Sequence, residues 1–175
     1  MVEWYIIHVH EGKEEKVAGI LKDKLPSALY RAFVPQREKY FRRTGVTKIE
    51  RSVCFPNYVF IESHAPSSAF KGAAFGLLYS IKEVYSILKY DGKDDITLQE
   101  NEREFLQRLL GTDDCIRVSS GDIIDGKLKI ASGALMGMEN AVKKIDRHKM
   151  TAELEITIMG KTQRMPVPLE IKTKS

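Results

Sequence analysis

The chain has 175 residues, enough for one large or two small domains, and its 30% charged and 43% hydrophobic residues are the proportions of an ordinary globular protein. The net charge of +4 is a weak argument for a polyanionic partner, but residues 126–175 hold ten Lys and Arg against five Asp and Glu. Cys54 and Cys115 are isolated, which predicts neither a disulfide framework nor a metal site, and we expect no cofactor. Glu3 stands where a signal peptide would be basic, and no apolar run is long enough to cross a membrane, so we expect a cytoplasmic protein that is not inserted in a membrane.

The first part of the chain predicts a strand, a helix and a long hairpin. Residues 3–10 are rich in aromatic and β-branched side chains, whereas residues 13–25 carry apolar side chains at helical spacing and stop at a proline. From residue 33 onward, charged residues alternate on both sides of the turn signal Thr44-Gly45. This segment is therefore expected to be a charged β-hairpin.

Residues 53–62 form the most aromatic and β-branched run of the sequence and predict a strand. Because Pro56 has no N–H to donate, regular pairing should begin after it, with Tyr58 and Phe60 on one face. The opposite face is apolar as well. The strand is therefore either a central core strand or the base of an aromatic patch for a partner.

Further elements complete a first domain. Residues 66–75 indicate a short helix and residues 84–89 a strand. A capping box at residues 97–100 predicts the start of a helix that ends at Gly111. We interpret residues 1–111 as an α+β domain, an antiparallel sheet with flanking helices.

The pattern changes after Gly111. Residues 112–122 are rich in turn residues and predict a linker, and the hydrophobic period is then two. About five short strands in residues 123–175 are typical of a small all-β barrel of SH3-like type.

A predicted turn at residues 146–149 concentrates cations beside two lysines of the preceding strand. Such donors suit phosphate contacts, and an arginine can also stack on an exposed RNA base. A charged turn can be merely solvated, but the local excess of cations favours RNA. The candidate RNA-binding residues are Lys127, Lys129, Lys143, Lys144, Arg147, His148 and Lys149.

His8 and His10 occupy alternate positions of the first strand, so their imidazoles share one face. HUH-type nucleases hold a divalent cation with such a pair, which keeps a nuclease as a distant alternative. The sequence shows no third ligand at a fixed spacing and no nucleophile constellation. We therefore expect a protein that is not an enzyme.

Short motifs run through nearly the whole chain in order: residues 4–8 (WYIIH), 33–35 (FVP), 55–60 (FPNYVF), 132–137 (SGALMG) and 160–161 (GK). Together with the capped helix they resemble the NusG family of transcription elongation factors, which join an NGN domain to a KOW domain. Asn57 stands where general members usually carry Gly, and it resembles specialised paralogs such as RfaH. Residues 145–149 are most similar to the LoaP and UpxY antiterminator branch.

The resemblance implies a monomeric, processive antiterminator, whose NGN domain binds RNA polymerase and whose KOW domain binds nascent leader RNA, at a hairpin. A general NusG with a protein-binding KOW domain is the alternative, and a contact with upstream or non-template DNA is left open. The polymerase contact implied by the family is an apolar patch on the clamp helices of the largest subunit. The candidates for it are Tyr5, Phe55, Tyr58, Phe60, Tyr85 and Ile87.

Overall fold

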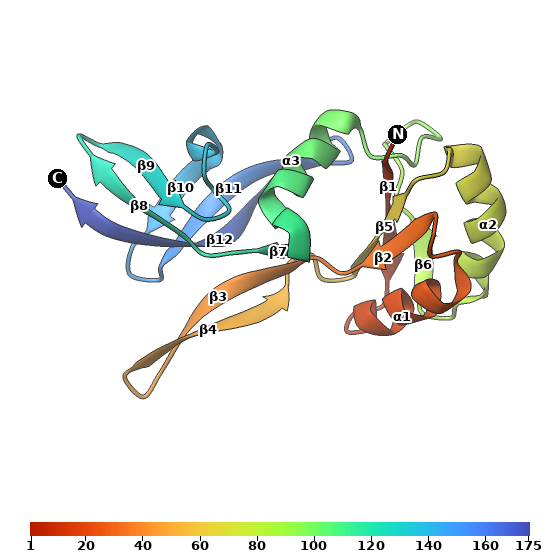
Figure 1. Ribbon diagram of the computed structural model, residues 1–175, viewed down its shortest axis with the longest axis horizontal. Helices are drawn as coiled ribbons and strands as arrows, with labels where there is room; N and C mark the ends of the chain where they lie inside the picture. The colour runs from red at the N-terminus through yellow and green to blue at the C-terminus, as the bar shows by residue number, and fades with distance from the viewer. The chain divides into compact units, whose positions relative to one another are not determined.

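The computed structural model describes residues 1–175 and divides into two compact units (Figure 1). Unit 1 comprises Met1–Pro35 and Phe55–Glu104, and unit 2 comprises Gln36–Cys54 and Phe105–Ser175. The hairpin at residues 36–54 is thus grouped with the C-terminal strands. Contacts alone do not define independently folding domains, so the boundaries at residues 111 and 123 stay a prediction.

Unit 1 is built on a four-stranded antiparallel sheet in the order β2-β5-β1-β6, which confirms the predicted antiparallel sheet. Its strands are β1 (Glu3–Val9), β2 (Tyr30–Phe33), β5 (Tyr58–Ser63) and β6 (Val84–Ile87). Its helices are α1 (Glu14–Lys24) and α2 (Ser67–Ser80), with the start of α3 (Glu100–Leu110). The helix α2 is longer than predicted, and no helix of the chain is long and apolar enough to cross a membrane.

The two central strands of this sheet are apolar on both faces because both faces are covered. On one face, the ring of Tyr5 stacks on Phe70 of α2 with 3.8 Å between centroids. On the other, Trp4 packs edge-on against Phe60, and both side chains are almost fully buried. Residues 58–63 are therefore a core strand, which was one of the two alternatives left open by the sequence.

The predicted capping box is wrong, because α3 begins at Glu100 and leaves Thr97 outside the helix. The N–H of Thr97 donates to Asp95 at 2.9 Å, and the N–H of Gln99 donates to the hydroxyl of Tyr90 at 2.8 Å. The free N–H groups before the helix are thus satisfied by other side chains. The predicted stop is confirmed: Gly111 follows the last helical residue with φ 65°.

Unit 2 contains a five-stranded sheet in the order β10-β11-β12-β8-β9 and a three-stranded sheet in the order β4-β3-β7. The first sheet comprises β8 (Ser119–Ile124), β9 (Lys127–Ser132), β10 (Val142–Asp146), β11 (Thr151–Ile158) and β12 (Lys161–Lys174). The second comprises β3 (Gln36–Arg43), β4 (Val46–Val53) and β7 (Cys115–Ile116), and two short 3₁₀ helices cover Gly111–Asp113 and Glu139–Ala141. Because β9 and β10 are unpaired edges, closure into an SH3-like barrel stays a prediction.

Residues 112–122, the predicted linker, contain β7 and the first part of β8, and their role as a connection between domains stays a prediction. Ser119 is buried there, and its hydroxyl accepts the N–H of Leu135 at 2.8 Å. Gly133 has φ 100° and packs closely on this segment: an added Cβ there would stand 2.3 Å from the carbonyl oxygen of Val118. Serine and glycine at these positions thus serve strand packing rather than a loose connection.

Candidate functional sites

Four rings line the end of the sheet of unit 1, and we call His8, His10, Tyr58 and Tyr85 the aromatic row. The centroid of His8 lies 5.4 Å from that of Tyr58 and 4.8 Å from that of Tyr85, and His10 lies 4.3 Å from Tyr85. Tyr85 is 58% exposed and the other three are partly exposed. The row is a partly exposed surface of neighbouring rings that are tilted against one another by 32° to 43°.

A bulge places Tyr85 in this row. The register of β1 against β6 shifts between His8 and Val9, where Val84 pairs with Val9 and Ser86 with His8. The extra residue, Tyr85, is therefore directed to the face of His8. Ile87 instead pairs with Ile7, and paired residues share a face, so Ile87 lies on the opposite side from the aromatic row.

The other predicted polymerase-binding residues lie in the core. Tyr5, Phe55 and Phe60 are 0%, 7% and 1% exposed. A buried side chain cannot touch a partner in this conformation, so these three do not share an exposed patch with Tyr58 and Tyr85 here, and their part in polymerase binding stays a prediction. Sequence reasoning did not place the two histidines beside Tyr58 and Tyr85, although their alternation already put them on one face. The chain has no group of three His, Cys, Asp or Glu side chains that could hold a metal.

The turn before β5 supports the row. Asn57 has φ 73°, a region that Asn and Gly enter most easily. Its N–H donates to the buried carboxylate of Glu14 at 2.8 Å, and its side-chain Nδ2 donates to the carbonyl of Val9 at 3.2 Å. These bonds fix the start of β5 against β1 and α1, and with it the position of Tyr58.

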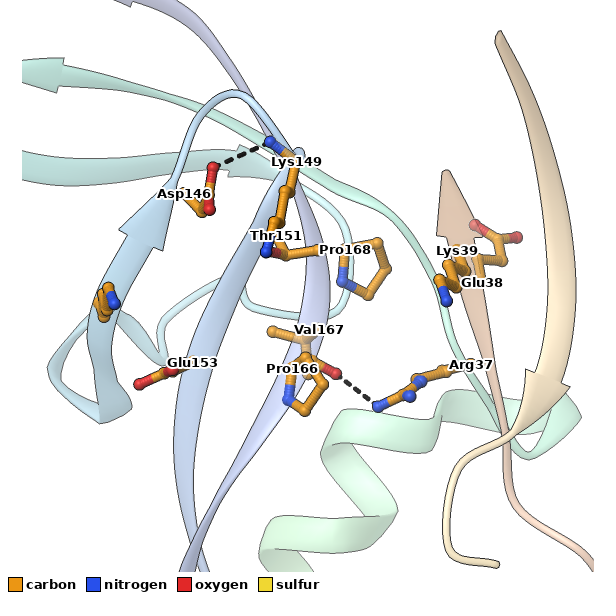
Figure 2. A pocket seen from close by; sticks show the side chains of 11 residues that line it. Arg37, Glu38, Lys39, Asp146, Lys149, Thr151, Glu153, Pro166, Val167 and Pro168 are labelled. Atoms are coloured by element: carbon orange, nitrogen blue, oxygen red, sulfur yellow. Dashed lines mark hydrogen bonds between the residues drawn. The ribbon is translucent and has the colours of Figure 1, made fainter. Parts of the chain in front are cut away.

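A second site lies within unit 2, where the hairpin strand β3 faces strands β10 to β12 of the five-stranded sheet. A pocket of about 310 Å³ there is lined by both, with Arg37 and Lys39 on one side and Lys149 and Thr151 on the other (Figure 2). A second hollow of about 310 Å³ shares Lys39, Lys149 and Thr151 and adds Arg42. We call these two hollows together the basic groove. Arg37 anchors it by donating to the carbonyl of Pro166 at 2.8 Å.

The acids of the basic groove are already engaged. Glu38 accepts the N–H of Val118 at 2.8 Å, and Glu153 pairs with Arg164 at 3.4 Å. The N–H of Lys149 donates to Asp146 at 2.9 Å, and this backbone hydrogen bond lowers the pKa of the Asp146 carboxyl. All three acids stay ionised, but the cations Arg37, Lys39, Arg42, Lys144 and Lys149 outnumber them, so the basic groove carries a net positive charge.

The predicted RNA-binding residues divide into two groups. Arg147, His148 and Lys149, which we call the basic turn, are exposed and connect β10 to β11, with Lys143 and Lys144 just before them on β10. Lys127 and Lys129 are exposed on β9, the other edge strand of the five-stranded sheet. The structure thus separates the two lysines of β9 from the basic turn.

A family model described as transcription termination factor NusG matches residues 2–107, more than half of the chain. The chain belongs to the NusG family. Two relatives, the transcription termination/antitermination proteins NusG of Bacillus subtilis and Thermus thermophilus, are each 22% identical to it over 178 residues. The first alignment covers 95% of this chain and 94% of the relative, and the second covers 97% and 95%.

The NusG fold is supported by a solved structure on domain interaction in Thermotoga maritima NusG. It aligns with 98% of this chain and 94% of its own length, at 22% identity and a TM-score of 0.57. The resemblance to NusG inferred from short motifs is therefore confirmed at the level of the family.

Proposed function

We propose that this NusG-family chain is a specialised antiterminator that binds RNA polymerase through unit 1 and nascent leader RNA through the basic turn of unit 2. The observation that carries the proposal is the state of the cations around that turn. Lys144 and Arg147 are exposed and make no side-chain hydrogen bond or ion pair, and Lys149 makes no ion pair. Unpaired cations on one rim are available for phosphates at little cost, since no ion pair has to be broken.

RNA hairpins suit this rim better than a duplex does. Proteins recognise RNA sequence mostly at loops and ends, where bases are unstacked and phosphates turn outward. A guanidinium such as that of Arg147 can fork to a phosphate or stack on a base. An exposed turn between two strands can enter such a loop, whereas Lys127 and Lys129 lie along a strand rather than on a turn.

The polymerase contact we propose is the aromatic row. Tyr58 and Tyr85 offer ring surface with a polar edge, and such side chains are frequent at the centre of interfaces. If the chain binds the elongating polymerase more tightly than the paused enzyme, it shifts the equilibrium between them by that difference in affinity. No catalytic step is required.

The RNA proposal is tested on the full chain by titration against a leader-type RNA hairpin and a duplex DNA at several salt concentrations. Replacing Arg147 and Lys149 by Ala removes two phosphate contacts. We expect the affinity for RNA to fall about 25-fold at about 0.1 M salt, and the slope of log K against log salt concentration to become less steep by about 1.4. The matched control is Lys127→Ala with Lys129→Ala, which removes the same charge from β9. Equal losses from both pairs would show that only the net charge matters.

The polymerase proposal is tested by binding of the chain to purified clamp helices. We expect Tyr58→Ala and Tyr85→Ala each to weaken binding about tenfold while the urea midpoint of unit 1 changes little, because both rings lie on the surface. Tyr79→Ala is the control, since Tyr79 is 73% exposed outside the row. If the chain bound polymerase fully but no RNA, a general NusG with a protein-binding KOW domain would be the better assignment.

A further inference from the structure

We infer that the basic groove holds a single strand of RNA, so that the hairpin β3–β4 and the basic turn grip the same segment from two sides. This inference rests on the proposed RNA-binding function and extends it to residues outside the barrel. Lys39 and Arg42 would contact phosphates from the hairpin, Lys144 from β10 and Lys149 from the basic turn.

The first support is that the hairpin and the barrel are held together within unit 2. The strand β3 pairs with β7 at Gln36 and Arg37, and β7 leads along the chain into β8. Glu38 pairs with Arg117 at 3.3 Å at the same point. The two walls of the groove are therefore fixed by backbone pairing and ion pairs rather than by a chance approach.

The second support is the open edge of β3. On one side β3 pairs with β4 over its whole length, but on the other it pairs with β7 only at its first two residues. From residue 38 onward this second edge is free and borders the groove at Lys39, Tyr40 and Arg42. Free N–H groups along an open strand edge can donate to phosphate oxygens, as they do in many nucleic-acid complexes.

The third support is the charge balance in the groove. Lys39, Arg42 and Lys144 make no side-chain hydrogen bond or ion pair. Two of the three acids, Glu38 and Glu153, are paired with arginines outside the groove, Arg117 and Arg164, and only Asp146 stays an anion without an ion pair. Bound phosphates would therefore meet free cations without competing for existing pairs.

The chemistry of the floor favours a single strand. Tyr40 is partly buried in the second hollow, and its hydroxyl is held by Glu170, so that burial and this carboxylate raise the pKa of Tyr40. Pro166, Val167 and Pro168 line the first hollow. A positively charged groove with an aromatic ring and apolar side chains is the usual arrangement for single-stranded nucleic acid, because unstacked bases need a surface to lie on.

The experiment compares two hairpin variants of the full chain in binding to a short single-stranded RNA of mixed sequence, an RNA hairpin and a duplex DNA. Lys39→Ala with Arg42→Ala should weaken binding to both RNAs about 25-fold at about 0.1 M salt and flatten the salt slope by about 1.4. Arg43→Ala with Lys48→Ala is the matched control: the same hairpin loses the same charge outside the groove, and affinity should change less than about twofold.

The outcomes separate the two proposals. If the basic-turn variant loses RNA affinity but the Lys39 and Arg42 variant does not, the groove inference is overturned and the proposed function stands. Equal losses from the two hairpin pairs, or tighter binding of duplex DNA than of RNA, also overturn it. If neither the basic-turn nor the hairpin variant weakens RNA binding, the proposed function itself fails.

A second measurement uses the wild-type chain and does not depend on the folding of a variant. An amine-acetylating reagent is applied with and without the single-stranded RNA, and the modified lysines are identified by mass spectrometry. Bound RNA should protect Lys39, Lys144 and Lys149 several-fold and leave Lys48 unchanged. Protection of Lys149 without protection of Lys39 would contradict the two-sided grip.

Discussion

Replacing Asn57 tests how the turn before β5 is held. The residue has φ 73° and makes one side-chain hydrogen bond, from Nδ2 to the carbonyl of Val9. Asn57→Ala places a Cβ without a polar group in the left-handed region, which costs roughly 1 to 2 kcal/mol, and loses a bond that contributes roughly 0.5 to 1.5 kcal/mol. Because Asn itself carries part of the backbone cost, we expect Asn57→Ala to lower the free energy of unfolding by about 2 kcal/mol.

Asn57→Gly separates the two contributions. Glycine loses the same hydrogen bond but adopts positive φ without strain, at the cost of a more flexible unfolded chain. We therefore expect a loss of about 1 kcal/mol for Gly, which gives the order of stability Asn, then Gly, then Ala. The hydrogen bond from the N–H of residue 57 to Glu14 is available to all three.

The assay is urea unfolding followed by tryptophan fluorescence. Trp4 is the only tryptophan, and it is 2% exposed on β1, so its emission reports on unit 1. With a urea dependence of about 2 kcal/mol per M, the midpoint should fall by about 1 M for Ala and about 0.5 M for Gly. If Ala were as stable as Gly, or more so, the strain at this turn would not be what selects the residue.

Three other predictions concern charge, thiol chemistry and packing. Burial raises the pKa of Glu62, but hydrogen bonding and charge from Arg31 outweigh it and hold that pKa below its usual range. Glu62→Gln should therefore destabilise unit 1 at pH 7, and its deficit relative to wild type should shrink as the pH falls below about 4. Burial raises the pKa of Cys54 to about 12, so a thiol reagent at pH 8 should label it only after unfolding, and rapid labelling of the folded chain would contradict its burial. Gly121→Ala places a Cβ 2.3 Å from the carbonyl oxygen of Lys129, and it should lower the stability of unit 2 by about 2 kcal/mol in urea unfolding; unchanged stability would contradict the close packing of β8 on β9.

Hydrophobic period was enough to predict most elements of this chain. Apolar residues at helical spacing predicted α1, and the period of two in residues 123–175 predicted short strands, of which β11 is one. The period failed where polar residues serve packing: Ser119 and Gly121 are buried in β8, and their turn-like character predicted a linker. Tertiary contacts decided there, and no local pattern contains them.

The site could be predicted only in part, because an apolar strand face has the same sequence pattern whether the chain or a partner covers it. Tyr58 and Phe60 are two residues apart on β5 and therefore share a face, yet Phe60 is buried and Tyr58 is partly exposed. The position of Tyr85 depends on a bulge, and that of Ile87 on the register beyond it. The basic turn, by contrast, is local in sequence, and the prediction of an exposed cluster of cations there is confirmed.

The cations of the hairpin also have a structural explanation, and the two explanations can be separated. Charged side chains along an open strand edge oppose pairing with another chain, and the edge of β3 is open beyond Arg37. Edge protection depends on the charge of the hairpin, so loss of Lys39 and Arg42 or of Arg43 and Lys48 should increase aggregation to a similar extent. RNA binding in the groove depends on position as well, so only the first pair should lower affinity. A variant pair that aggregates without losing RNA affinity therefore identifies edge protection, and one that loses affinity while remaining monomeric identifies the groove.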